Sequence, residues 1–180
     1  MLLQLGELIY QALPEFYEKV PLAKEKLLLL LADQVDVPET ELSETYAFWE
    51  AGSLLGLLSV VDSADLKVAE TSGVVSLLRE LNGEGRNSFK KALAGYGQRV
   101  EGLAILEGKY LPRMAVAPAA RGKGVARALM KHVLDLYPND LFALHVAQTN
   151  AIVIHLHTSL GFKPQSQTDS PIRVLIRPPI

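Results

Sequence analysis

Apolar residues near the N-terminus recur every three or four positions over residues 2–13 and 15–35. This is the repeat of amphipathic helices, and Pro14 and Pro21 stand where a helix can begin. We therefore expect two N-terminal helices that cover another element. Over residues 46–61 the pattern changes to two arms around a short turn, which predicts a β-hairpin. The second arm is apolar on both faces, so we expect it inside a sheet.

The rest of the chain alternates between helix and strand patterns. Residues 63–81 and 87–100 have a helical pattern, and the glycine-rich residues 82–86 between them are expected to form a loop. A pair of helices is thus inserted between strands. The elements expected after this pair are strand 109–116, helix 124–137, strand 141–146, helix 150–159 and a final strand over 172–176.

Composition favours a single soluble domain. A chain of 180 residues that is 49% hydrophobic can bury one substantial core. Its net charge of −2 provides no basic field for nucleic acid or an anionic membrane. The absence of cysteine excludes disulfides and thiolate ligands and fits a reducing compartment, so the expected location is cytoplasmic. The N-terminus lacks the basic start of a secretory signal, and the longest apolar run, residues 27–32, is too short to cross a bilayer.

Residues 117–124 join the strand at 109–116 to the helix at 124–137 and contain Gly122 and Gly124. The first amides of a helix have no internal partner and point outward at the positive end of its dipole. Glycine permits backbone conformations that turn several such amides toward one anion, so a diphosphate is the expected ligand. The alternative is an ordinary strand-to-helix turn in which the glycines only ease the bend.

Four basic residues surround this helix start and give weak support to an anion site. Lys123, Arg127 and Lys131 are four residues apart and could equally form one solvated stripe beside Arg121. Two other phosphate motifs do not fit. The third glycine of a dinucleotide fingerprint would fall at Arg127, and no serine or threonine follows a Gly-Lys pair to hold magnesium.

Several segments in order resemble the signature of the GNAT superfamily of acetyl-coenzyme A dependent N-acetyltransferases. The strand at 111–118 is followed by Arg-Gly-Lys-Gly-Val-Ala at 121–126, which is similar to the family pattern of Gln or Arg, two residues, Gly, one residue, then Gly or Ala. Downstream, the strand at 144–146, then Asn150, then Leu-Gly-Phe at 160–162 resemble the family's next strand, its asparagine and its Leu-Gly-Phe ending.

This resemblance implies an α/β (α+β) fold of GNAT type, with a central mixed, mostly antiparallel twisted sheet flanked by helices. It implies a single acetyltransferase domain over residues 1–180, with N-terminal helices at 1–40, a helical insertion at about 63–100 and a cofactor-binding core at about 105–165. The sheet is expected to splay so that the pantetheine arm of acetyl-coenzyme A (acetyl-CoA) lies in the split. The residues implied to bind this cosubstrate are Met114, Ala115, Val116, Arg121, Gly122, Lys123, Gly124, Val125, Ala126 and Asn150.

The family commonly places a tyrosine in the helix after its asparagine to protonate the departing thiolate, and that position here is His157. Asn150 and His157 share one helix face, while His155 lies nearly opposite. An imidazole can serve as the acid. The alternative is a partly buried packing residue, and Asn150 can likewise be a helix cap. A metal site built from His145, His155 and His157 is disfavoured because the last two rings diverge, so no metal is expected.

The general base and the acceptor pocket are less defined. Glu107 is the preferred candidate for the base, with Glu50 and Glu101 as alternatives, although each can be a solvated surface charge. The acceptor pocket is expected near the N-terminal helices and the strand connections. Aromatic residues that could line it, or simply pack in the core, are Tyr10, Phe16, Tyr17, Tyr46, Trp49 and Tyr96.

The predicted function is transfer of an acetyl group from acetyl-CoA to a primary amine of a small molecule or peptide. A non-catalytic acyl-CoA sensor or interaction module is the alternative, because the expected tyrosine is missing and the base is unplaced. The expected partners are acetyl-CoA and the amine acceptor, with no nucleic acid and no membrane. The sequence does not decide between a monomer and a homodimer.

Overall fold

The computed structural model describes residues 1–35, 37–100, 107–165 and 171–179. Its strands are β1 (Glu44–Glu50), β2 (Ser53–Asp62), β3 (Lys109–Tyr110), β4 (Met114–Val116), β5 (Phe142–Ala147), β6 (Lys163–Pro164) and β7 (Ile172–Arg177). Within these residues the strands form one sheet in the order β1-β2-β3-β5-β7-β6, and β4 also pairs with β2. The pairs are antiparallel except β3 with β5, so the expected mixed, mostly antiparallel sheet is confirmed.

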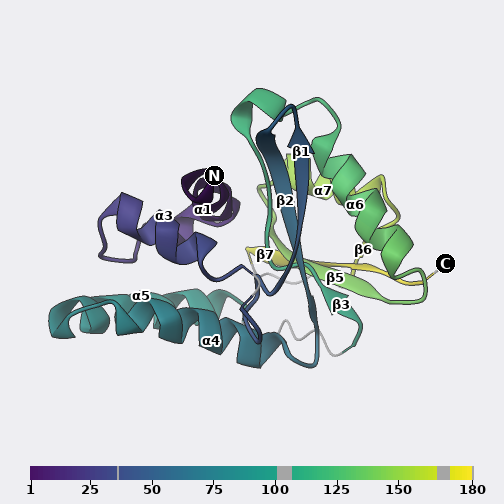
Figure 1. Ribbon diagram of the computed structural model, residues 1–180. Helices are drawn as coiled ribbons and strands as arrows, with labels where there is room; N and C mark the ends of the chain where they lie inside the picture. Colours follow the sequence, from purple (N-terminus) through teal and green to yellow (C-terminus); the bar gives the residue numbers. More distant parts are fainter. Residues whose placement is uncertain (36, 101–106, 166–170, 180) are drawn as a thin grey trace.

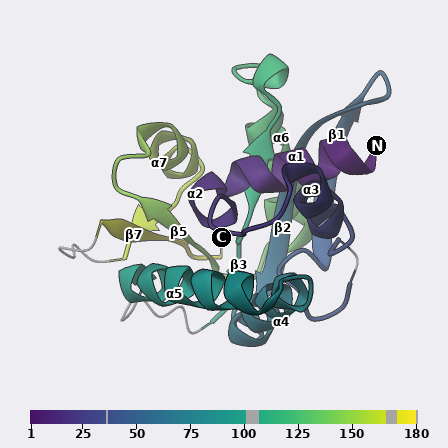
Figure 2. The same cartoon turned by 90° about the vertical axis from the view of Figure 1, so that its left-hand side faces the viewer.

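Helices cover both faces of this sheet (Figure 1). They are α1 (Leu2–Ala12), α2 (Pro14–Tyr17), α3 (Lys24–Ala32), α4 (Leu66–Arg79), α5 (Gly83–Val100), α6 (Val125–Leu136), α7 (Ala151–Thr158) and the short 3-10 helix η1 (Pro118–Ala120). Residues of α6 and α7 pack with β2 and β5 in one apolar cluster. Residues of α1 to α5 pack on the other side of β2 in a second cluster, as the turned view in Figure 2 also shows.

Two expected boundaries are wrong. The helix expected over 15–35 is divided into α2 and α3, because Pro21 lacks an N–H and its ring disfavours a helical conformation at the residue before it. Residues 83–86 of the expected loop 82–86 instead form the first turn of α5. Asn82 Oδ1 accepts a hydrogen bond from the Gly85 amide at 2.8 Å, so the asparagine caps a helix that begins at residues expected to form a loop.

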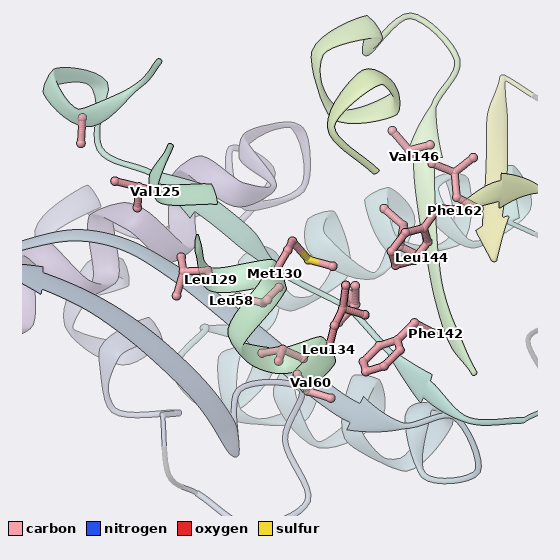
Figure 3. Packing of buried hydrophobic residues seen from close by; sticks show 14 residues of the cluster. Leu58, Val60, Val125, Leu129, Met130, Leu134, Phe142, Leu144, Val146 and Phe162 are labelled. Carbon is pink, nitrogen blue, oxygen red and sulfur yellow. The ribbon is translucent and has the colours of Figure 1, made fainter. Parts of the chain in front are cut away.

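The helix α6 is held tightly against the sheet at its first turn. Its buried residues Val125, Leu129 and Met130 face β2 and β5 in the cluster drawn in Figure 3. Gly56 of β2 permits this approach, since a Cβ there would lie 2.8 Å from Val125 Cγ1. The start of α6, and the loop before it, are therefore fixed relative to the sheet.

The strand expected over 109–116 is interrupted. Tyr110 pairs with Val61 and Met114 pairs with Leu58, so four steps along this segment match three steps along β2. The one extra residue is a bulge, which bends the strand and ends β3 before β4 begins. The continuous strand of the sequence interpretation was therefore wrong in detail.

Candidate functional site

The sheet opens between β4 and β5, and this opening is called the split here. Tyr110 pairs in parallel with Ala143, and the Leu111 amide donates to the Ala143 carbonyl at 3.0 Å. Beyond this point β4 pairs with β2 while β5 pairs with β7. Within the described residues no pairing joins β4 to β5, so the splay implied by the resemblance is present, with its closed end at Leu111.

The edge of β4 that faces the split pairs with no other strand among the described residues. The Arg113 carbonyl accepts from β2 at 2.9 Å, and the Ala117 amide donates to β2 at 2.9 Å. Because antiparallel pairing alternates, the backbone groups of Met114 and Val116 face away from β2. The predicted contacts of Met114 and Val116 with the pantetheine arm fit this direction, whereas Ala115 uses its backbone toward β2.

The loop before α6 has the conformation that an anion site needs. Gly122 has φ 75° and Gly124 has φ 84°, both in the left-handed region that favours glycine. A Cβ at either position would meet no atom within 4 Å, so open space lies beside both residues. These glycines therefore shape the loop rather than relieve close packing.

Several amides of this loop point outward with no partner. Within the described part of the chain, no hydrogen bond to another group is made by the amides of Gly122, Gly124, Val125 and Ala126. They stand at the positive end of the α6 dipole, where an anion is favoured. The arrangement can bind one or two phosphate groups through main-chain donors.

The basic side chains near this loop are only partly available to a ligand. Arg121 Nε donates to the Val116 carbonyl at 3.2 Å, which places the guanidinium at the edge of the split. Arg127 donates to Ser159 Oγ at 2.8 Å and so ties α6 to the end of α7. Lys123 and Lys131 are exposed, as a solvated stripe requires.

Asn150 caps α7. Its Oδ1 accepts from the Val153 amide at 3.2 Å, which is the helix-cap role that the sequence allowed. The Asn150 side chain is exposed, and its part in cofactor binding stays a prediction.

His157 is buried, with 2% of its surface exposed. Its Nδ1 lies 2.8 Å from the Val153 carbonyl, and since a carbonyl can only accept, Nδ1 carries the hydrogen. Its ring packs edge-on against Phe162, with centroids 5.0 Å apart. Burial lowers the pKa of His157, so the neutral ring has no second hydrogen on Nε2 to give. This geometry suits the packing alternative, and the acid role stays a prediction.

Of the carboxylates considered as bases, Glu107 and Glu50 lie away from the split. Glu107 is exposed and precedes β3, so the chain must pass through the paired residues of β3 before it reaches the split. Its carbonyl accepts from Ser63 Oγ at 3.1 Å. Glu50 is exposed at the turn end of β1, and Glu101 falls outside the described residues. The assignment of Glu107 stays a prediction.

A histidine and a tyrosine meet at the closed end of the split, which the sequence interpretation missed. Tyr110 Oη lies 2.9 Å from His145 Nδ1, and the two ring centroids are 5.6 Å apart. Tyr110 ends β3 and His145 lies two residues beyond the last β5 residue that pairs with β3. The contact depends on the strand register, and no local sequence motif predicts it.

Arg113, in the bulge, forms a half-buried ion pair with the segment before β1 and a hydrogen bond with α2. Arg113 donates to Glu41 Oε2 at 2.9 Å, and its Nε lies 3.3 Å from Tyr17 Oη. Burial raises the pKa of the Tyr17 hydroxyl. Tyr10 and Phe16 also pack in the N-terminal cluster, whereas Trp49 is 46% exposed. The Tyr96 side chain falls outside the described set, and the acceptor-lining role of these aromatics stays a prediction.

Two negative observations apply to the described residues alone. They contain no group of three or more histidine and acidic side chains able to hold a metal ion. Among their helices none is both long and apolar enough to cross a bilayer.

Comparison with known proteins agrees with this geometry. Residues 90–162 match the sequence profile of the acetyltransferase (GNAT) family. A segment of 60 residues is 37% identical to the peptidyl-lysine N-acetyltransferase YiaC of Escherichia coli K12, covering 33% of this chain and 40% of that relative. The family profile and this relative both indicate the GNAT superfamily for this part of the chain. The segment that matches the family profile includes the loop at 121–126 and ends at Phe162. This match confirms the family resemblance of these residues.

Solved structures share the fold across nearly the whole chain. An N-acetyltransferase from Staphylococcus aureus Mu50 has a TM-score of 0.70 at 15% identity, covering 95% of this chain and 92% of that chain. The PaiA N-acetyltransferase from Thermoplasma acidophilum, solved with coenzyme A, has a TM-score of 0.51 at 13% identity and covers 98% and 92%. At these identities the likeness concerns the fold alone.

Proposed function

We propose that this protein is a GNAT acetyltransferase that binds acetyl-CoA and acetylates a primary amine of a small molecule or peptide. One observation carries the proposal: the outward amides of Gly122, Gly124, Val125 and Ala126 stand beside a split whose β4 edge is unpaired. An anion site and a free strand edge side by side suit a ligand with a diphosphate and an amide-bearing arm. Coenzyme A has both parts.

In this arrangement the diphosphate lies on the loop at 121–126 and the arm runs along β4 from Val116 toward Met114. The thioester then lies near the closed end of the split at Leu111. Arg121 must release the Val116 carbonyl if the arm is to pair with that group, and its guanidinium can then turn to the phosphates. Asn150 and Lys123 are the further predicted contacts.

The chemistry needs a neutral amine that attacks the thioester carbonyl. The carbonyl oxygen becomes an oxyanion, for which a backbone amide facing the split, such as that of Met114, is a suitable donor. Collapse of this intermediate breaks the C–S bond, releases the coenzyme A thiolate and, with loss of a proton from the nitrogen to solvent, leaves the amide. With His157 buried and neutral, solvent is a sufficient proton source for the thiolate.

The peptide or small-molecule nature of the acceptor is the finer part of the proposal. YiaC acts on peptidyl lysine, and this favours including lysine peptides among the acceptors. A second candidate function is a non-catalytic acyl-CoA sensor, which the lack of a free proton on His157 Nε2 favours.

A single assay separates the two functions. Purified protein is mixed with acetyl-CoA and a panel of polyamines, amino acids and lysine peptides, while thiol release and acetylated product mass are followed. Release coupled to one acetylated amine supports the transferase. Tight cofactor binding without release across the panel supports the sensor and contradicts the proposal.

A further inference from the structure

We propose that Tyr110 and His145 form the proton-accepting pair that makes the acceptor amine a nucleophile. This inference rests on the proposed transferase function and adds the general base that the sequence did not identify. The pair is defined by the 2.9 Å contact between Tyr110 Oη and His145 Nδ1.

The position of the pair carries the inference. Tyr110 is the last residue of β3, directly before Leu111 at the closed end of the split, where the proposed arm places the thioester. His145 lies on the part of β5 that has left β3 and pairs only with β7 among the described strands. The two side chains therefore reach across the point at which the strands diverge.

The pair faces away from the helix that binds the cofactor. Leu144 and Val146 point into the α6 cluster, so the alternation of a strand turns His145 to the opposite face. Tyr110 packs on that same face with Ala69 of α4. An acceptor that approaches from this face meets the thioester from the side opposite α6.

Acetyl transfer to an amine requires a base that removes a proton from the acceptor ammonium. A primary amine with a pKa near that of lysine, about 10.4, is almost entirely an ammonium at neutral pH and has no lone pair. A phenol alone is a poor base there, whereas an imidazole takes up a proton near neutrality. His145 is half-buried and Tyr110 is 7% exposed, so the imidazole is the more accessible member.

The proton is conserved in the proposed step. The ammonium gives one proton to the neutral pair, directly to the imidazole or to Tyr110 Oη as that hydroxyl passes its own proton to Nδ1. Either route leaves a neutral amine, a neutral tyrosine and an imidazolium. The amine then attacks the thioester, the C–S bond breaks, and the nitrogen loses its second proton to solvent as the amide forms. The thiolate takes up a proton from the imidazolium or from solvent, and an imidazolium that keeps its proton returns it to solvent.

The other candidates are placed less well for this step. The His157 ring is enclosed by Phe162 and bonded to its own helix. Glu107 is exposed on the far side of the paired residues of β3. Among these three groups, the Tyr110–His145 pair alone lies at the point of strand divergence.

The test compares His145→Ala and Tyr110→Phe with His155→Ala, which alters an exposed histidine of α7 as a matched control. For the best acceptor of the panel, kcat/KM is measured at pH 7.0 and 9.5, together with the Kd for acetyl-CoA. We expect His145→Ala to lower kcat/KM at pH 7.0 by about 10² or more and Tyr110→Phe by about 10-fold or more, with Kd unchanged. The deficit should shrink at pH 9.5, because the amine then loses its proton to solvent.

The possible outcomes distinguish failure of the Tyr110–His145 proposal from failure of the proposed transferase function. Unchanged kcat/KM in His145→Ala, or an equal loss at both pH values, overturns the pair while acetyl transfer by the unaltered protein still supports the transferase. Failure of the unaltered protein to acetylate any amine overturns the transferase and the role of the pair with it. The His155→Ala control must keep the unaltered rate.

Discussion

Replacing Gly124 by valine should remove acetyl-CoA binding while leaving the fold intact. Gly124 has φ 84°, where a side chain costs about 1–2 kcal/mol and a β-branched one more. Because a Cβ there meets no atom within 4 Å, no packing penalty is added. The loop can relieve the strain by leaving the left-handed region, which turns the Gly124 and Val125 amides away from a shared anion.

The loss of binding can be estimated from those amides. A hydrogen bond to a charged group contributes about 1.5–3 kcal/mol, so losing two of them weakens binding by at least about 100-fold. Calorimetric titration with acetyl-CoA measures the Kd, and urea unfolding measures stability.

The hairpin turn offers a matched control for this change. Gly52 has φ 77° and also open space around its Cβ position, so Gly52→Val imposes similar strain outside the glycine loop. It should lose comparable stability and keep the unaltered Kd. The reasoning is refuted if Gly124→Val binds acetyl-CoA as tightly as the unaltered protein, or if both variants lose binding equally.

Three further predictions concern stability. Burial lowers the pKa of His157 below its unfolded value of about 6.5, so the stability it contributes is present above that pH and is lost as pH falls toward the lowered value. Urea unfolding at pH 7.5 and 5.5 should therefore show less acid sensitivity in His157→Gln, and equal sensitivity would contradict this. Gly6→Ala should cost at least about 2 kcal/mol, since its Cβ would lie 2.0 Å from the Leu28 carbonyl oxygen; an unchanged unfolding midpoint would refute this. Tyr137→Phe removes a hydrogen bond to Glu44 and should lower the free energy of unfolding, measured in urea, by about 1.5–3 kcal/mol. The Kd for acetyl-CoA should not change, and weaker binding would contradict the proposed position of the cofactor site.

Much of the fold follows from local patterns in the sequence. The hairpin turn at 51–53, the buried β2 and the apolar face of α6 each depend on residues close in sequence, and each is found as expected. The glycine loop is also local, because Gly122 and Gly124 determine its backbone whatever lies beyond it.

The interruption between Tyr110 and Met114 could not be predicted in this way. A bulge appears only in the register of two strands, and the apolar pattern of 109–116 reads through it. The start of α5 was missed for a related reason: the glycines suggested a loop, but the Asn82 side chain caps the helix.

The candidate site also combines a part that local sequence predicts with a part that depends on contacts between distant residues. The glycine loop at 121–126 consists of consecutive residues and can be recognised from them. Tyr110 and His145, in contrast, are 35 positions apart and come together through the β3–β5 pairing. At His157, helical spacing predicted which face of α7 the side chain occupies but not how deeply it is buried. Its burial follows from packing with Phe162, which helical spacing alone does not reveal.

A crystal structure with bound acetyl-CoA tests the central claim most directly. The account predicts the diphosphate on the amides of Gly122, Gly124, Val125 and Ala126, the arm against the free edge of β4, and the acetyl carbon near Leu111. A cosubstrate bound elsewhere, with these amides facing solvent and the split closed by protein side chains, would contradict it.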